Sequence, residues 1–250
     1  MGKIRVVCSQ KGGVGKTTTS FHLVHGVSET LAELQPNEQG LAIDFCGQGN
    51  LSQFLTGNLD IQKQPGGAEM LFEGGDLPYT DTMLPNVKLL FGHSDLGLLD
   101  IDDSILERAL ELRDYVRELP FAHIIIDTPP ALGPRIAAPM LWAHEAYIVV
   151  EAHMSSVTGL DDTFRTIEVA QELNPDLDVK LVLNRFMKAS SSAKMFQAVL
   201  EERFGSDLVE KFALRTGVAD ACQNFVPVWK FAKDKELKQQ WRNFATQAFA

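Results

Sequence analysis

A glycine-rich stretch near the N-terminus constrains the fold more than any other feature of this chain. Residues 10–20 read Gln-Lys-Gly-Gly-Val-Gly-Lys-Thr-Thr-Thr-Ser. The mostly apolar residues 4–8 just before them predict a short buried β-strand. Just after them, apolar side chains recur at helical spacing and predict an α-helix. These side chains are Phe21, Val24, Val27, Leu31 and Leu34.

A glycine-rich loop between a strand and a helix is the context of a phosphate-binding loop. Its glycines let backbone N–H groups form an anion nest, to which the helix N-terminus adds its dipole. We expect Lys16 to reach the β- and γ-phosphates, Thr17 to place its hydroxyl on Mg²⁺, and Thr18 to bond the α-phosphate. The alternative is a turn with an incidental lysine. The predicted nucleotide-binding residues here are Gly12, Gly13, Val14, Gly15, Lys16, Thr17 and Thr18.

The loop departs from the ordinary pattern G-x-x-x-x-G-K-[ST], because its first position is Gln10 and it carries an additional lysine, Lys11. The run Lys-Gly-Gly-Val-Gly-Lys-Thr-Thr resembles the deviant Walker A motif of the ParA/MinD family of P-loop ATPases. The resemblance implies that the chain binds ATP and Mg²⁺. It also implies that Lys11 crosses to the nucleotide of the partner subunit in an ATP-bound dimer.

A second motif follows the predicted strand 41–45. It is similar to the partition-ATPase pattern Asp-x-Asp-Pro-Gln-Gly-Asn, with Asp44 at the first aspartate. Cys46 stands at the second aspartate and Gly47 at the proline. In the family, that second aspartate positions the attacking water, so the resemblance implies slow hydrolysis here. The predicted catalytic residues are Lys11, Lys16 and Asp44.

The predicted strand 121–127 ends in Asp-Thr-Pro-Pro. An acidic residue at the end of a buried strand beside a phosphate loop is a Walker B arrangement, so Asp127 is expected to bind Mg²⁺ through water, together with Thr17. The family shows Asp-x-Pro-Pro here as a switch that senses the γ-phosphate. The alternative is an aspartate that caps the next helix.

Two further segments resemble the family's adenine site. The predicted strand 179–183 leads into Asn184, which the resemblance implies reads the adenine edge. Residues 225–228 resemble the adenine-packing loop, which makes Pro227 a predicted contact. Residues 215–221 resemble the family's Arg-Asn-Val-x-Leu-Ala-Glu-Ala.

The net charge of −10 argues against nucleic-acid binding, but the basic residues are unevenly distributed. Residues 179–200 contain four basic and no acidic residues, and residues 226–242 contain five basic and two acidic residues. These lysines form either a chance solvated cluster or a surface for DNA phosphates, and the family resemblance favours DNA contacts without sequence preference. The predicted DNA-binding residues are Arg185, Lys188, Lys194 and Arg215.

The 250 residues, 45% of them hydrophobic, suit a single α/β domain over 1–250. Alternating strands and helices predict a doubly wound, mostly parallel β-sheet with helices on both faces, of the P-loop NTPase type. An apolar stripe over 105–119 predicts one amphipathic helix with a solvated acidic side. His22 and His25 could hold a metal by spacing, but are expected to be core or surface residues.

Three distant cysteines, no signal peptide and no apolar run of membrane-spanning length predict a cytoplasmic protein. The resemblance implies a ParA-like ATPase: an ATP-dependent homodimer that associates with the nucleoid by binding nonspecific DNA. Such a protein positions a plasmid, a chromosome region or other cargo and is reset by a ParB-like partner. Three alternatives remain open: a nucleotide-operated switch with little hydrolysis, a MinD-like membrane-surface switch, and an iron–sulfur ATPase. Packing of the last helix argues against stable membrane insertion, and the lack of paired cysteines argues against a cluster.

Overall fold

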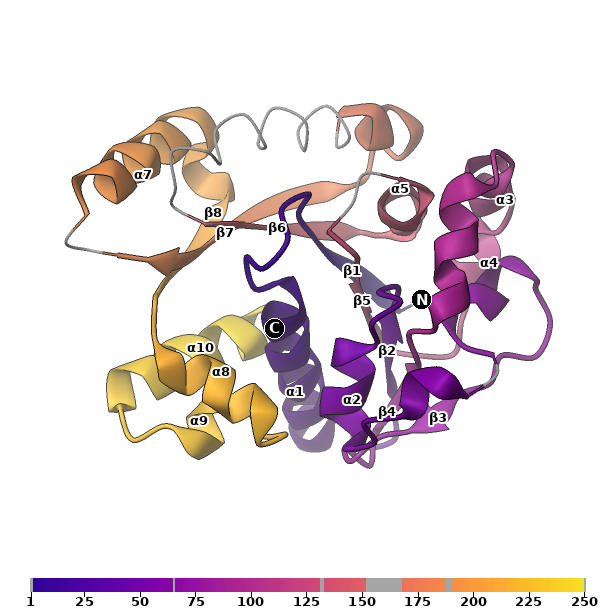
Figure 1. The fold of residues 1–250 in the computed structure, drawn as a ribbon, viewed down its shortest axis with the longest axis horizontal. Helices are drawn as coiled ribbons and strands as arrows, with labels where there is room; N and C mark the ends of the chain where they lie inside the picture. The colour runs from indigo at the N-terminus through magenta and orange to yellow at the C-terminus, as the bar shows by residue number, and fades with distance from the viewer. Residues whose placement is uncertain (1, 65, 131–132, 152–167, 188–189, 250) are drawn as a thin grey trace.

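The computed structural model describes residues 2–64, 66–130, 133–151, 168–187 and 190–249. Among them, eight strands form one sheet in the order β3-β4-β2-β5-β1-β6-β7-β8 (Figure 1). Every neighbouring pair is parallel except β3 and β4. The strands are β1 (Lys3–Cys8), β2 (Gly40–Asp44), β3 (Thr80–Asp81), β4 (Val87–Leu90), β5 (His123–Asp127), β6 (Glu145–Glu151), β7 (Asp178–Phe186) and β8 (Leu208–Ala213).

Helices cover both faces of this sheet, as the alternation of strands and helices predicts. The α-helices are α1 (Lys16–Leu34), α2 (Asn50–Thr56), α3 (Ile105–Glu111), α4 (Arg113–Arg117), α5 (Pro134–Trp142), α7 (Ser191–Phe204), α8 (Thr216–Gln223), α9 (Val228–Phe231) and α10 (Lys235–Gln247). Short 3₁₀ helices are η1 (Ile61–Lys63), η2 (Ala68–Phe72), η3 (Ser94–Ile101) and η4 (Gly205–Asp207). Residues 168–173 are also helical.

Two hydrophobic cores lie on opposite faces of the sheet, because alternate residues of a strand point to opposite sides. Ile4 and Val6 of β1 belong to the core beneath α3, α4, α5 and α7. Val7 belongs to the other core, beneath α1, α2, α8, α9 and α10. In this second core, Trp241 stacks on Phe212 with ring centroids 3.9 Å apart. The aromatic stripe of the last helix is therefore packed against the domain.

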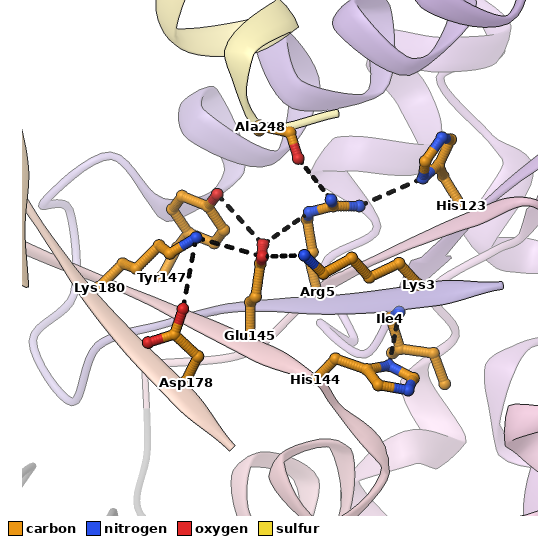
Figure 2. A network of polar contacts seen from close by, with 10 residues as sticks. All are labelled: Lys3, Ile4, Arg5, His123, His144, Glu145, Tyr147, Asp178, Lys180 and Ala248. Atoms are coloured by element: carbon orange, nitrogen blue, oxygen red, sulfur yellow. Dashed lines mark hydrogen bonds and ion pairs between the residues drawn. The ribbon is translucent and has the colours of Figure 1, made fainter. Parts of the chain in front are cut away.

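A buried ionic network closes the amino ends of the central strands (Figure 2). Arg5, only 1% exposed, donates from Nε to Oε2 of Glu145 at 2.8 Å and also to the carbonyl of Ala248. Lys180 Nζ lies 3.1 Å from Oε1 of the same glutamate, and the Arg5 guanidinium lies over the ring of Phe249. The network therefore holds Ala248 and Phe249 against the amino ends of the central strands.

The structure confirms the predicted fold class and differs from the sequence predictions in detail. The single helix predicted over 105–119 is wrong, because the chain breaks at Leu112 into α3 and α4. After the break, Arg113 and Arg117 both donate to Oδ1 of Asn174, which is buried. Strands β3 and β8 and helix α5 were not predicted. Of the helix predicted over 157–173, only 168–173 lie within the described residues, and these are helical.

Candidate nucleotide-binding site

The site lies at the carboxyl ends of three adjacent strands. β5 pairs with β1 on one side and with β2 on the other, so the loops that follow these strands meet. The register places Asp44 directly opposite Asp127. Carboxyl ends of parallel strands are where open α/β sheets bind ligands. The three sequence motifs are therefore brought together by the topology.

The conformation of the phosphate loop depends on glycine at two positions. Gly13 and Gly15 have φ angles of 77° and 104°, in the left-handed region that favours glycine. A Cβ on Gly15 would also lie 2.2 Å from Nδ2 of Asn184. That nitrogen donates to the carbonyl of Val14 at 2.8 Å, so Asn184 supports the loop from beneath. Reading of adenine by Asn184 remains a prediction.

Lys16 begins helix α1 and is 6% exposed. Its Nζ donates to the carbonyl of Lys11 at 3.1 Å, folding the side chain back over its own loop. Burial lowers the pKa of Lys16, and the nearby Asp127 carboxylate opposes this effect. A buried ammonium held by a single backbone carbonyl is suited to an anionic ligand entering the loop.

Asp127 is fully buried at the end of β5 and accepts two hydroxyl hydrogen bonds. Thr17 Oγ1 donates to its Oδ2 and Ser20 Oγ to its Oδ1, each at 2.8 Å. Burial raises its pKa, and the neighbouring Asp44 raises it further. Hydroxyl and carboxylate oxygens are the donors that Mg²⁺ prefers, so this pair fits the cation. Sequence reasoning missed Ser20, although it lies three residues after Thr17 on the same side of the helix.

Asp44 is fully buried and supports the loop that follows β2. Its Oδ1 accepts from the backbone N–H of Cys46 at 3.0 Å. Its Oδ2 accepts from both the backbone N–H and the hydroxyl of Ser52, at 3.0 and 2.8 Å. Burial raises the pKa of Asp44 to about 6, against the lowering effect of the Ser52 hydrogen bonds. Its catalytic role stays a prediction.

A pocket of about 340 Å³ opens between the phosphate loop and the loop after β2. Lys16, Thr17, Cys46 and Thr128 line it. The Cys46 thiol is half-buried, and its pKa is raised by burial and then by Asp44, which keeps it neutral. The position at which the family pattern has a carboxylate is thus occupied by an uncharged thiol.

A second pocket of about 190 Å³ lies beside Asn184 and is lined by Thr216, Val218 and Ala219 of helix α8. Gly15 and Thr18 line both pockets, so the two lie side by side at the phosphate loop. Pro227 does not line either pocket in the described part of the chain. The next residue, Val228, donates its N–H to Nε2 of His22 at 3.1 Å, and contact of Pro227 with adenine stays a prediction.

Two of the predicted DNA-binding residues, Arg185 and Arg215, line the same pocket. Arg185 lines both pockets and has a φ of 54°, which is unusual for a residue other than glycine. Arg215 is exposed and lines the second pocket, whereas Lys194 is exposed on α7. Lys188 lies outside the described residues. Arg185 and Arg215 are therefore also placed to contact a nucleotide, and the DNA contacts remain predictions.

The side chain of Lys11 is half-exposed, and its Nζ lies 3.9 Å from Oε2 of Glu151 at the end of β6.

His22 and His25 are buried beneath α9 and α10, in contact with Trp229. Among the described residues, no cluster of three or more His, Cys, Asp or Glu side chains could hold a metal. Both histidines are core residues, one of the two placements expected from the sequence.

Comparison with known proteins identifies a family for this chain. The profile of the AAA domain family AAA_31 matches residues 2–179. The chain is 27% identical over 219 residues to the chromosome partitioning protein ParA of Caulobacter vibrioides, covering 83% of this chain and 79% of that protein. It is 29% identical over 205 residues to the sporulation initiation inhibitor protein Soj of Bacillus subtilis, covering 77% and 76% respectively.

Solved structures share the fold. The ATP complex of a point variant of Cyanothece McdA superposes with a TM-score of 0.81 at 20% identity, covering 99% of this chain and 96% of that one. A plasmid partition protein of Borrelia burgdorferi bound to AMPPNP gives 0.79 at 21% identity, covering 100% and 98%. No helix within the described ranges combines the length and apolar character needed to cross a bilayer. The chain therefore belongs to the AAA domain family AAA_31, and within it to the ParA-like proteins with a deviant Walker A loop.

Proposed function

We propose that this chain is a ParA-like ATPase that binds ATP with Mg²⁺ at the two adjoining pockets beside the phosphate loop. The single observation that carries the proposal is the pairing of Thr17 with Asp127 directly behind the buried Lys16. That arrangement joins a cation for phosphates to a hydroxyl–carboxylate pair for a hard metal. The neighbouring McdA and Borrelia proteins, crystallised with ATP and AMPPNP, support the same ligand class.

The chemistry is phosphoryl transfer to water, in which the protein positions groups and stabilises charge. Lys16 exchanges its contact with the Lys11 carbonyl for the β- and γ-phosphates. Thr17, and Asp127 through water, would hold Mg²⁺, which when bound neutralises charge on the phosphate oxygens. Gly13 and Gly15 orient the loop backbone so that its N–H groups face the ligand.

Hydrolysis is proposed to be slow, because Cys46 supplies no carboxylate to align the attacking water. A neutral thiol is a weak hydrogen-bond acceptor. The two other acids nearby, Asp44 and Asp127, are already engaged by Ser52 and by Thr17 and Ser20. A nucleotide-operated switch with little turnover is therefore the second candidate function.

The ATP-bound state is proposed to be a face-to-face homodimer in which Lys11 acts on the partner's nucleotide. The half-exposed side chain of Lys11 supports this role, because its only ion-pair partner among the described residues is at 3.9 Å. The dimer would bind DNA phosphates through Arg215 and Lys194 and position a plasmid, chromosome region or other cargo, with a ParB-like partner resetting it. Relatives named ParA and Soj support this assignment.

Isothermal titration of the apo protein with ATP in Mg²⁺ buffer tests the nucleotide site. Wild type should bind, and Lys16→Ala should lose most of the affinity because the cation facing the phosphates is gone. Lys194→Ala, an exposed lysine on α7, is the matched control and should bind like wild type. Equal affinity in wild type and Lys16→Ala would remove the phosphate loop from the proposal.

DNA binding is tested separately by retardation of an arbitrary duplex in gels. It should need ATP, ignore sequence and weaken steeply with salt, because phosphate contacts release counterions. Arg215→Glu with Lys194→Glu should abolish it. Retention of full retardation in that double variant would exclude these two residues as the DNA contact.

A further inference from the structure

Arg135 is a mostly buried arginine beside the loop that carries Cys46. It lies in the first turn of α5, and its side chain is 13% exposed. Its Nε and Nη2 both donate to Oδ2 of Asp100 on η3, and the Nε bond is 2.9 Å long. One carboxylate oxygen therefore holds two of the three guanidinium nitrogens and fixes the plane of the group.

Asp100 is committed to holding this arginine. Its other oxygen, Oδ1, is buried and has no hydrogen-bond partner among the described residues. A Cβ on Gly133 would lie 3.1 Å from that oxygen, so the carboxylate packs closely against the start of α5. A partly buried carboxylate with one cationic partner depends strongly on that partner. The Asp100–Arg135 pair therefore connects η3 to the first turn of α5.

The third guanidinium nitrogen, Nη1, faces the loop after β2. It lies 3.5 Å from the carbonyl oxygen of Phe45. The N–H of the same peptide bond belongs to Cys46 and donates to Oδ1 of Asp44 at 3.0 Å. One peptide group is thus held at its oxygen by Arg135 and at its hydrogen by Asp44. Because the peptide group is planar, these two contacts set the position of the Cα of Cys46.

The direction of the side chain at position 46 matters for the phosphate pocket. Cys46 lines that pocket together with Lys16 and Thr17. Burial and then the Asp44 carboxylate raise the pKa of the Cys46 thiol, and the Arg135 guanidinium opposes this rise, so its charge reaches the thiol. Among the described residues that line the pocket, Arg135 is not included. Its influence on the pocket therefore passes through the loop that carries Cys46.

We propose that Arg135, anchored by Asp100, is a positioning residue for ATP hydrolysis, which directs the side chain at position 46 toward the phosphates. This role rests on the proposed ATPase function. Arg135 holds the loop and does not touch the nucleotide, so its loss should change the rate and leave ATP affinity unchanged. Small displacements of a group that aligns an attacking water are costly in rate.

Arg135→Lys separates positioning from ion pairing. A lysine keeps a positive charge for Asp100, but its single nitrogen on a shorter side chain cannot also bond the carbonyl of Phe45. Asp100→Asn is the second variant, because it keeps an oxygen acceptor and loses the charge, and it should show the same changes to a smaller degree. The matched control is Arg242→Lys, in an arginine of α10 that pairs with Glu29.

Alkylation of Cys46 by iodoacetamide, followed by mass spectrometry of the labelled peptides, tests the direction of the side chain without turnover. Saturating ATP with Mg²⁺ should slow alkylation by about tenfold in wild type and in Arg242→Lys, because the thiol faces the occupied pocket. In Arg135→Lys the protection should fall to about threefold or less, with ATP affinity by titration calorimetry within about twofold of wild type.

The two other cysteines of the chain are internal controls. Cys8 and Cys222 are buried and should stay unlabelled in every variant, which distinguishes a turned side chain from a loosened fold. Labelling of both together with Cys46 in Arg135→Lys would show a purely structural role and overturn the positioning role.

Phosphate release in the Cys46→Asp background tests the effect on rate, because a carboxylate at position 46 can align water. Adding Arg135→Lys should lower kcat about tenfold and leave KM for ATP unchanged, whereas adding Arg242→Lys should change neither. ATP binding with equal protection of Cys46 in wild type and Arg135→Lys would overturn the positioning role alone. Absence of ATP binding in wild type would overturn the nucleotide proposal and the positioning role with it.

Discussion

The imidazole of His22 links the phosphate loop to Val228. Nε2 of His22 accepts the backbone N–H of Val228 at 3.1 Å, so the ring proton is on Nδ1, which donates to the carbonyl of Thr18 at 2.7 Å. Burial lowers the pKa of His22 to about 4, which keeps the ring neutral at pH 7. Since Val228 follows Pro227, the ring fixes the distance between the phosphate loop and the predicted adenine-packing loop.

Replacing His22 by Phe should lower the free energy of unfolding by about 1–3 kcal/mol, because the buried N–H of Val228 loses its hydrogen-bond partner. His25→Phe is the matched control, since Nδ1 of His25 is buried without a hydrogen bond, and it should cost less than about 1 kcal/mol. Urea unfolding at pH 7 measures both values. Similar losses in the two variants would contradict the linking role.

Asp127→Asn should stabilise the apo protein at high pH. The raised pKa of Asp127 means that its contribution to stability is full below the unfolded value of 3.8 and falls as the pH rises through about 7. The asparagine amide does not ionise and so does not lose stability as the pH rises. The free energy of unfolding of the variant should therefore increase relative to wild type by about 1–3 kcal/mol between pH 5 and pH 8. Urea unfolding in EDTA without nucleotide measures the difference. A pH-independent difference would contradict the burial of a charged carboxylate at this position.

Cys46→Asp should raise ATP turnover. Restoring a water-positioning carboxylate commonly gains about tenfold to a thousandfold in rate, or about 1.4–4 kcal/mol. The third carboxylate near Asp44 and Asp127 should also destabilise the apo protein. Phosphate release at saturating ATP measures the rate, with Cys46→Ser as the neutral control. If wild type turns over faster than Cys46→Asp, another group holds the water and slow hydrolysis is refuted.

Arg185 should act on nucleotide through its side chain and on stability through its backbone. Arg185→Ala and Arg185→Gly should weaken ATP binding equally, by about tenfold, because both lose the guanidinium between the two pockets. The Arg185→Gly variant should have a free energy of unfolding about 1 kcal/mol higher than that of Arg185→Ala, because residue 185 has a φ of 54°. Titration calorimetry and urea unfolding separate the effects. Unchanged ATP affinity in both variants would refute the nucleotide contact and leave Arg185 as a candidate DNA-binding residue.

The features that could be predicted from the sequence are those that depend on residues close together in the chain. The phosphate loop could be predicted because the glycines that allow its backbone conformation and the lysine that faces phosphate, Gly13, Gly15 and Lys16, lie within four residues of sequence. Asp127 was predictable because it ends an apolar run of strand length. The parallel order of the sheet followed from alternating strands and helices.

The rest depends on contacts between residues far apart in the chain. Ser52 shows no motif, yet it donates twice to Asp44 because α2 begins beside β2. Arg135 joins η3 to the loop after β2 only through the tertiary fold. Arg185 is exposed, and its place beside both pockets comes from the tertiary fold rather than from a local motif. The break at Leu112 was hidden because the apolar stripe continues across it.

The most direct test of the ATPase switch is the molar mass in solution, measured by light scattering with saturating ATP and Mg²⁺. Wild type should change from a monomer of 27.7 kDa to a species of twice that mass. Lys11→Ala should bind ATP yet remain at 27.7 kDa, and Lys16→Ala should remain there because it binds no nucleotide. A Lys11→Ala protein that dimerises as fully as wild type, or a wild type that stays monomeric with ATP bound, would contradict the account.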